Sequence, residues 1–160
     1  MITLRELRNE DIATIKAWPP YPQDCTDLDY AVRDNGGLDE YRAKPGTEIL
    51  VAEEGETLAG FSVLEQEPGR QAEFRIAVHP GKIGHGLGKT IALRTLAHGF
   101  ANPGIDLIRL IVRKNNVRAQ RLYASLKFRG TGECIEEVHG KMVAFYRMEI
   151  SRDTFFEESR

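Results

Sequence analysis

Residues 79–90 read H-P-G-K-I-G-H-G-L-G-K-T and separate a stretch that alternates apolar and polar residues from one with helical periodicity. Glycines alternate through this loop, which lets successive backbone N–H groups converge where side chains would interfere. The helix predicted to follow adds the positive potential of its N-terminus. The loop therefore predicts a site for an anion, above all a phosphate, around Gly84, Gly86 and Gly88, with Lys82 and Lys89 at its edges.

Three phosphate-binding loops are candidates for this stretch. A Walker A loop, G-x-x-x-x-G-K-[ST], needs a glycine where Ile83 stands. A dinucleotide loop, G-x-G-x-x-G, would start at Gly84 and needs a glycine where Lys89 stands. The third, (R/Q)-x-x-G-x-(G/A), belongs to proteins that bind acyl-CoA, and residues 83–88 match its two small positions but not its first. A glycine-rich turn without a ligand stays open at this point.

The patterns on both sides of the loop predict a mixed sheet. Strands are expected at 1–8, 48–53, 57–65, 71–79, 105–112, 132–138 and 142–150, and Phe74, Ile76 and Val78 share one face of the fourth. Helices are expected at 9–17, where the prolines of 18–22 end the first one, and at 87–100 and 115–126, with helical turns at 27–34 and 38–43.

The order of these elements defines the fold class. A strand, a helix and then a buried strand imply one right-handed βαβ crossover inside a mostly antiparallel sheet. We expect an α+β fold, α/β/α-like in its layers, with about seven strands and flanking helices. It forms a single domain over 1–151, followed by a C-terminal tail over 152–160 in which Phe155 and Phe156 favour some contact with the body.

Composition and charge argue against several classes of protein, including those that bind nucleic acid or a membrane surface. Apolar residues make up 41% and charged residues 29% of the 160 residues, and the formal net charge of −2 gives no field that would recruit nucleic acid or a membrane. The first residues carry charges where a signal peptide would be apolar, so a cytoplasmic protein is expected. Cys25 and Cys134 lie far apart and the four histidines lack ligand spacing, which argues against a disulfide framework and a metal site.

A second motif stands downstream of the glycine loop. Residues 112–128 read V-R-K-N-N-V-R-A-Q-R-L-Y-A-S-L-K-F. Together with the strand, V-H-P, glycine loop and helix over 74–100, this segment resembles the GNAT superfamily of acyl-CoA-dependent N-acyltransferases, whose later signature is V-x-x-x-N-x-x-A-x-x-L-Y-x-x-x-G-F. The two motifs lie in the family's order. The resemblance implies a twisted sheet with a splayed central parallel pair, and acetyl-CoA as the cosubstrate.

The resemblance also gives each matching residue a role. Backbone amides of the loop would hold the CoA pyrophosphate, the edge of the strand before it would pair with the pantetheine arm, and the last helix would touch that arm. The cofactor-binding residues so implied are Ile76, Ala77, Val78, Ile83, Gly84, His85, Gly86, Leu87, Gly88, Lys89, Asn116, Ala119 and Tyr123. The implied catalytic residues are Tyr123, a general acid facing the sulfur, and Glu73, a general base.

Simpler explanations of three of these residues stay open. Tyr123 also suits a core position of an amphipathic helix, and Asn116 suits an N-cap. Glu73 could form an ordinary surface pair with Arg75.

Two positions depart from the family pattern. Ile83 replaces the usual Arg or Gln, so one side-chain contribution to the loop is absent. Lys127 replaces a glycine that usually ends the helix in the left-handed conformation, which costs other residues roughly 1 kcal/mol. We expect a strained or reshaped helix end at Lys127.

The expected function is transfer of an acetyl group from acetyl-CoA to a primary amine, by direct attack through a tetrahedral intermediate. Deprotonating a lysine-like amine at pH 7 costs roughly 4.6 kcal/mol, so a general base would assist the reaction of such an amine. The N–H of Val78 would stabilise the oxyanion. From ordinary pKa values, full proton transfer from Tyr123 to the leaving thiolate is uphill by roughly 2 kcal/mol. A non-catalytic acyl-CoA sensor is the alternative, and a nucleotide-binding switch is a third reading.

The acceptor amine is less defined. Six acids against one base, Arg33, occupy the segment after the first helix, and an acidic wall would suit a cationic amine or a basic peptide, although a solvated loop explains them equally well. These acids are Asp24, Asp27, Asp29, Asp34, Asp39 and Glu40. Trp18 and Tyr21 form either an apolar rim of the acceptor cleft or a plug in the core. The protein is expected to be a monomer or a homodimer.

Overall fold

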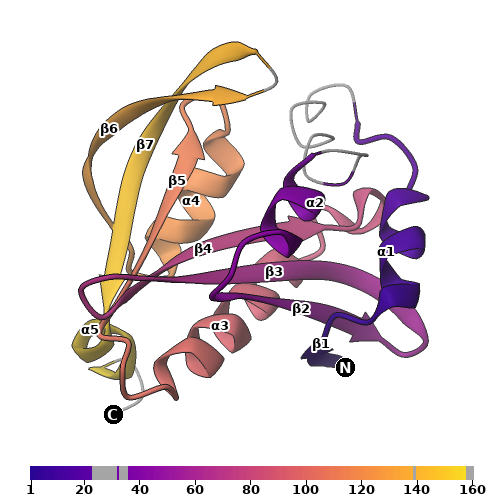
Figure 1. Ribbon diagram of the computed structural model, residues 1–160, viewed down its shortest axis with the longest axis horizontal. Coiled ribbons are helices and arrows are strands. Elements are labelled where there is room, and N and C mark those ends of the chain that lie inside the picture. The colour runs from indigo at the N-terminus through magenta and orange to yellow at the C-terminus, as the bar shows by residue number, and fades with distance from the viewer. Residues whose placement is uncertain (23–31, 33–35, 139, 158–160) are drawn as a thin grey trace.

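The computed structural model describes residues 1–22, 32, 36–138 and 140–157, and its centre is one seven-stranded sheet (Figure 1). The strands are β1 (Ile2–Glu6), β2 (Thr47–Glu54), β3 (Thr57–Glu67), β4 (Gln71–Val78), β5 (Leu107–Arg113), β6 (Arg129–Val138) and β7 (Lys141–Ser151). The helices are α1 (Asn9–Lys16), α2 (Gly37–Arg42), α3 (Leu87–Phe100), α4 (Val117–Ser125) and α5 (Arg152–Glu157), with a short 3₁₀ turn, η2, at Pro80–Lys82.

The strands lie in the order β1-β2-β3-β4-β5-β7-β6, and all neighbours are antiparallel except β4 and β5. α3 connects this parallel pair, as the predicted crossover requires. The pairing of β4 with β5 begins at Gln71 with Leu107 and ends at Glu73 with Arg109. Beyond that point the two strands diverge, and Figure 1 shows β4 and β5 running in different directions. The α+β class, the seven strands and the splayed parallel pair are therefore confirmed.

Helices cover both faces of the sheet, because the strands alternate apolar side chains to both sides. Phe74 of β4 packs with the buried residues of α3 and α4. Ala77, of the opposite parity, packs with α1 and α2 on the other face. Ile76 and Val78 lie on the Phe74 side against α3, as predicted.

Several predicted boundaries move by one or two residues. The buried strand after α3 begins at Leu107, and α4 begins at Val117 because Asn116 is its N-cap. The helical turn predicted at 38–43 is α2, whereas the turn predicted at 27–34 lies mostly outside the described residues.

Trp18 and Tyr21 belong to the core and do not form an exposed rim. They are 6% and 4% exposed, and both pack in the cluster under α1 and α2. The Tyr21 hydroxyl donates a hydrogen bond to the carbonyl of Val78 at 2.7 Å.

α5 (Arg152–Glu157) follows β7 directly and packs through aromatic contacts. The rings of Phe155 and Phe156 lie 5.4 Å and 6.3 Å from the ring of Phe100 at the end of α3. The division into a domain over 1–151 and a tail stays a prediction. None of the helices within the described ranges is long and apolar enough to cross a membrane.

Candidate active site

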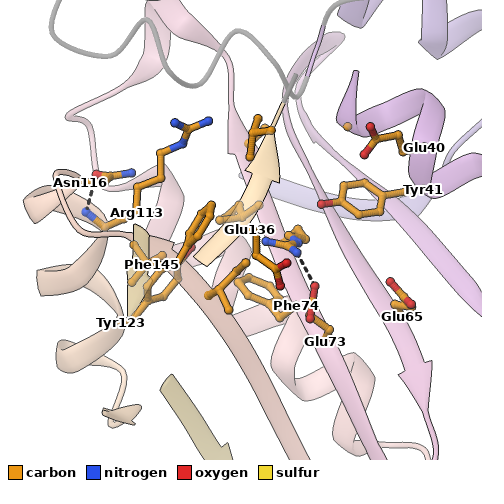
Figure 2. Close-up of a pocket in the computed structure, with 18 of the residues that line it drawn as sticks. Glu40, Tyr41, Glu65, Glu73, Phe74, Arg113, Asn116, Tyr123, Glu136 and Phe145 are labelled. Carbon is orange, nitrogen blue, oxygen red and sulfur yellow. Dashed lines mark hydrogen bonds and ion pairs between the residues drawn. The ribbon is translucent and has the colours of Figure 1, made fainter. Parts of the chain in front are cut away.

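The divergence of β4 and β5 opens a cavity of about 450 Å³. Side chains of both strands line it, together with α2, the first turns of α4 and the β6–β7 hairpin. In Figure 2, Asn116 and Arg113 lie at one end, Glu40, Tyr41 and Glu65 lie at the other, and Phe74, Tyr123 and Phe145 lie between them. Of the residues predicted for the site, this cavity brings together Glu73, Ile76, Ala77, Asn116, Ala119 and Tyr123.

Backbone groups of β4 face the gap. The N–H of His79 donates to the carbonyl of Ala59 at 2.8 Å, and the register pairs Phe61 with Ala77, so alternate residues of β4 bond to β3. Ile76 and Val78 have the opposite parity and therefore direct their N–H and C=O groups away from β3, where β5 no longer pairs. Of these groups, the Val78 carbonyl already accepts the hydrogen bond from the Tyr21 hydroxyl. This edge is what an extended, amide-containing chain needs for pairing.

Tyr123 lies in the cavity wall and is almost fully buried. It is 7% exposed, and its ring makes edge contacts with Phe74 and Phe128 at 6.2 Å and 5.6 Å. Burial raises the pKa of Tyr123 to about 12, partly offset by the positive charge of Arg75. The phenol is therefore neutral at pH 7 and can donate a hydrogen bond. It is both a core tyrosine and a cavity residue.

Asn116 likewise has a structural role and a place at the cavity. Its side-chain oxygen accepts a hydrogen bond from the N–H of Ala119 at 3.1 Å and caps α4. The same side chain lines the cavity. Because the cap uses the oxygen, the amide N–H₂ group remains as a donor.

Glu73 is held by two guanidinium groups. One carboxylate oxygen lies 2.5 Å from Arg75 and the other 3.1 Å from Arg109, and the side chain is 12% exposed. Arg109 also forms a two-pronged bond to Glu67 at 2.6 Å. The predicted pair with Arg75 is thus confirmed, but as part of a network across β3, β4 and β5 at the point where the splay begins.

The glycine loop follows β4 directly and lies outside the lining of the cavity. Gly84 and Gly86 have φ values of 87° and 79°, which other residues adopt only with strain, and Gly86 is the N-cap of α3. A Cβ at Gly88 would contact Leu122 of α4 at 3.4 Å, so α4 packs against the loop. Gly84 and Gly86 therefore use the conformational freedom of glycine, and the convergence of the loop N–H groups on an anion stays a prediction.

The two lysines of the loop differ. Lys82 forms a 2.7 Å ion pair with Glu54 of β2, which takes its charge away from the loop. Lys89 is exposed on the first turn of α3. Ile83, the atypical loop residue, packs its side chain against the cluster under α1 and α2.

Lys127 confirms the expectation for the end of α4. Its φ is 77°, one of two positive values among the non-glycine residues that the structure describes. The preceding helix ends at Ser125, and the N–H of Phe128 bonds back to the carbonyl of Tyr123. The glycine-type turn is therefore kept although the residue is a lysine.

Four of the six glutamates that line the cavity were missed by sequence reasoning. Glu65, Glu67, Glu136 and Glu137 line it together with the predicted Glu40. Of the other predicted acids, Asp24, Asp27, Asp29 and Asp34 lie outside the described residues, and Asp39 pairs with Lys16 at 2.8 Å. A usable signal was present, since Glu65 and Glu67 alternate on β3 and so share a face with Glu73 of the neighbouring strand.

Metal ligands do not gather anywhere in the described part of the chain, where no group of three or more His, Cys, Asp or Glu residues could hold an ion. Cys134 is a free thiol on β6. Cys25 and His139 lie outside the described residues.

Known proteins share both the sequence pattern and the fold. A sequence model described as the acetyltransferase (GNAT) family matches residues 5–128, most of the chain. The chain belongs to the GNAT acetyltransferase family. A mycothiol acetyltransferase of Kineococcus radiotolerans is 35% identical over 80 residues, which are 50% of this chain and 26% of that protein. The chain thus matches only about a quarter of this curated relative's length.

Solved GNAT structures align with nearly the whole chain. A mutant form of the spermidine/spermine N-acetyltransferase SpeG from Vibrio cholerae is 23% identical with a TM-score of 0.77, covering 100% of both chains. The same organism's spermidine N-acetyltransferase in complex with CoA and spermine is 24% identical with a TM-score of 0.74, covering 97% of this chain and 98% of that one. At these identities the likeness shows the shared fold.

Proposed function

We propose that this GNAT protein is an N-acetyltransferase that transfers an acetyl group from acetyl-CoA to a primary amine, either of a small cationic molecule or of a peptide. The observation that carries the proposal is the backbone edge of β4 that β5 leaves unpaired, formed by Ile76 and the N–H of Val78, which leads into the left-handed glycines of the loop. A pantetheine arm has the spaced amides of a short peptide strand, and a diphosphate suits converging N–H groups at a helix N-terminus.

The proposed donor runs from the loop along β4 into the cavity. The amides of residues 83–89 would bind the diphosphate, and the amides of 76–78 would pair with the arm. Asn116 still has an amide N–H₂ group to donate, and Ala119 offers a small side chain beside it. This course would bring the thioester to the part of the cavity that Tyr123 lines.

In the proposed reaction a neutral amine attacks the thioester carbonyl and a C–N bond forms. The N–H of Val78, turned toward the gap, would stabilise the oxyanion. The C–S bond then breaks, the amine loses a proton to a base or water, and the thiolate gains one. With a tyrosine pKa of about 12 and a thiol near 8.5, full proton transfer from Tyr123 is uphill by about 5 kcal/mol. Tyr123 would therefore act mainly as a hydrogen-bond donor to the developing thiolate.

The proposed base is Glu73, acting directly or through water. A carboxylate offers about four lone-pair sites, so two guanidinium partners leave room for a further acceptor bond. The arginines would also keep the carboxylate in place at the edge of the cavity.

A cationic acceptor fits the charges of the cavity. Six glutamates, at 40, 65, 67, 73, 136 and 137, line it against three cations, Lys44, Arg75 and Arg113. The excess of negative charge favours a protonated amine over an anionic substrate. Polyamines are therefore reasonable acceptors, in agreement with the spermine bound by the structural relative.

The test is release of free CoA thiol from acetyl-CoA with a panel of acceptors: a polyamine, an aminoglycoside, a lysine-containing peptide and a peptide with a free N-terminus. The proposal predicts thiol release that depends on at least one amine, with the N-acetylated product found by mass spectrometry. A protein that binds acetyl-CoA but releases no thiol with any of these amines would instead be an acyl-CoA-binding regulatory module.

A further inference from the structure

Helix α4 carries a guanidinium to the glycine loop. Arg118 lies in its first turn, and its Nη1 atom is 3.9 Å from the position that a Cβ on Gly84 would occupy. One turn later, Leu122 lies 3.4 Å from the position that a Cβ on Gly88 would occupy. Residues four apart lie on one helix face, so Arg118 and Leu122 together define the face of α4 that covers the loop.

Arg118 has no competing partner in the described part of the chain. It is exposed, and neither an ion pair nor a hydrogen bond joins it to another described residue. Lys82, in contrast, is committed to Glu54 at 2.7 Å. A cation left free beside left-handed glycines at a helix N-terminus is suited to a bound anion.

At the loop position where the family pattern has a basic or amide side chain, this chain has Ile83, which serves the core. Ile83 stands where the acyl-CoA loop pattern has Arg or Gln, and its side chain packs into the cluster under α1 and α2. The loop therefore supplies backbone donors and Lys89, but no guanidinium.

We propose that Arg118 of α4 binds the diphosphate of acetyl-CoA and supplies from a neighbouring helix the guanidinium that position 83 lacks. The assignment rests on the proposed function. A guanidinium presents paired N–H donors that match two phosphate oxygens, which a lysine ammonium does not. Leu122 fixes the helix against Gly88, so the guanidinium stays beside the loop.

The experiment compares Arg118→Gln with wild type for three donors: acetyl-CoA, acetyl-3′-dephospho-CoA and S-acetylpantetheine. We expect KM for the first two to rise by the same factor, roughly 10- to 100-fold as for a lost hydrogen bond to a charged group, with kcat little changed. S-acetylpantetheine lacks the diphosphate, so wild type and variant should use it equally. KM of the Arg118→Lys variant should lie between those of wild type and Arg118→Gln, because lysine keeps the charge but lacks the paired N–H donors of a guanidinium.

Arg121→Gln is the matched control, since Arg121 is an exposed arginine on the same helix without a contact to the loop glycines. An equal rise in KM for this variant would overturn the proposal in favour of a general positive field. A loss that disappears with the dephospho donor would also overturn it, because Arg118 would then bind the 3′-phosphate. Failure of the wild-type protein to use or bind acetyl-CoA would overturn the proposed function itself and this assignment with it.

Discussion

Tyr123 combines two properties that oppose each other in a general acid. Burial makes it available as a neutral phenol at every pH near neutrality, because its pKa rises to about 12. The same burial makes loss of the phenol proton less favourable, so a hydrogen bond to the thiolate is the better account of its proposed role. The position is set by packing between Phe74 and Phe128, which orient the ring.

Replacement of Tyr123 by phenylalanine should lower kcat roughly 10- to 100-fold, the loss of one hydrogen bond to a developing charge. KM for acetyl-CoA should change little, because the contacts proposed for the diphosphate and the pantetheine arm lie elsewhere. Steady-state kinetics measure both. Tyr146→Phe, at an exposed tyrosine of β7, is the control and should behave as wild type. Equal turnover in the Tyr123→Phe enzyme would remove the phenol from the mechanism.

Lys127 holds a left-handed conformation that suits glycine better. With φ at 77°, Lys127→Gly should raise the free energy of unfolding by up to about 1 kcal/mol, measured by denaturant titration. Lys127→Ala keeps the Cβ and should give no such gain. A glycine variant that is less stable than wild type would mean that the lysine side chain makes a stabilising contribution larger than the strain.

At the scale of elements, Asp11 links three of them. Its buried carboxylate receives two bonds from Arg5 of β1, at 2.8 and 2.9 Å, and one from the N–H of Arg8 at the start of α1. Arg5 in turn reaches Glu53 of β2 at 2.6 Å. Hydrogen bonding by Arg5, opposed by burial, holds the pKa of Asp11 below its ordinary value of 3.8.

A carboxylate whose pKa is lower in the folded state than in the unfolded state stabilises the fold. This contribution is complete when the pH is above the unfolded-state pKa, and it is lost as the pH falls through the folded-state pKa. Asp11→Asn should therefore cost about 3 kcal/mol of unfolding free energy at pH 7, as for a buried pair that loses one partner. The difference from wild type should shrink as the pH drops from about 5 toward 2. Chemical denaturation at several pH values measures it, and a difference independent of pH would contradict the ionic account.

Elements with a clear period could be predicted from the sequence nearly to their ends. The strand over 71–79 alternates Phe74, Ile76 and Val78, and it is observed as Gln71–Val78. The cap at Asn116 and the prolines after Lys16 mark the helix ends with side-chain chemistry that is local in sequence. Local signals of this kind do not need the tertiary structure.

At the scale of the whole molecule, the site joins residues whose proximity has no local signal. Glu65, Glu73 and Glu136 come from three strands, and their meeting depends on strand order and register. The same holds for Lys82 with Glu54, and for Arg118 with Gly84, which are separated by an entire strand and helix. The resemblance to a family suggested roles for the matching residues, which stay proposals, but it could not suggest partners that vary between members.

The central claim is that the glycine loop and the open edge of β4 bind acetyl-CoA. Thermal unfolding of the protein with acetyl-CoA, CoA, ATP or NAD tests it most directly. At 100 times its Kd, a ligand that binds only the folded state adds roughly 2.7 kcal/mol, which corresponds to several degrees in Tm for a chain of this size. The account predicts this shift with both CoA species and little with ATP or NAD. No shift with either CoA species, or an equal shift with ATP, would contradict it.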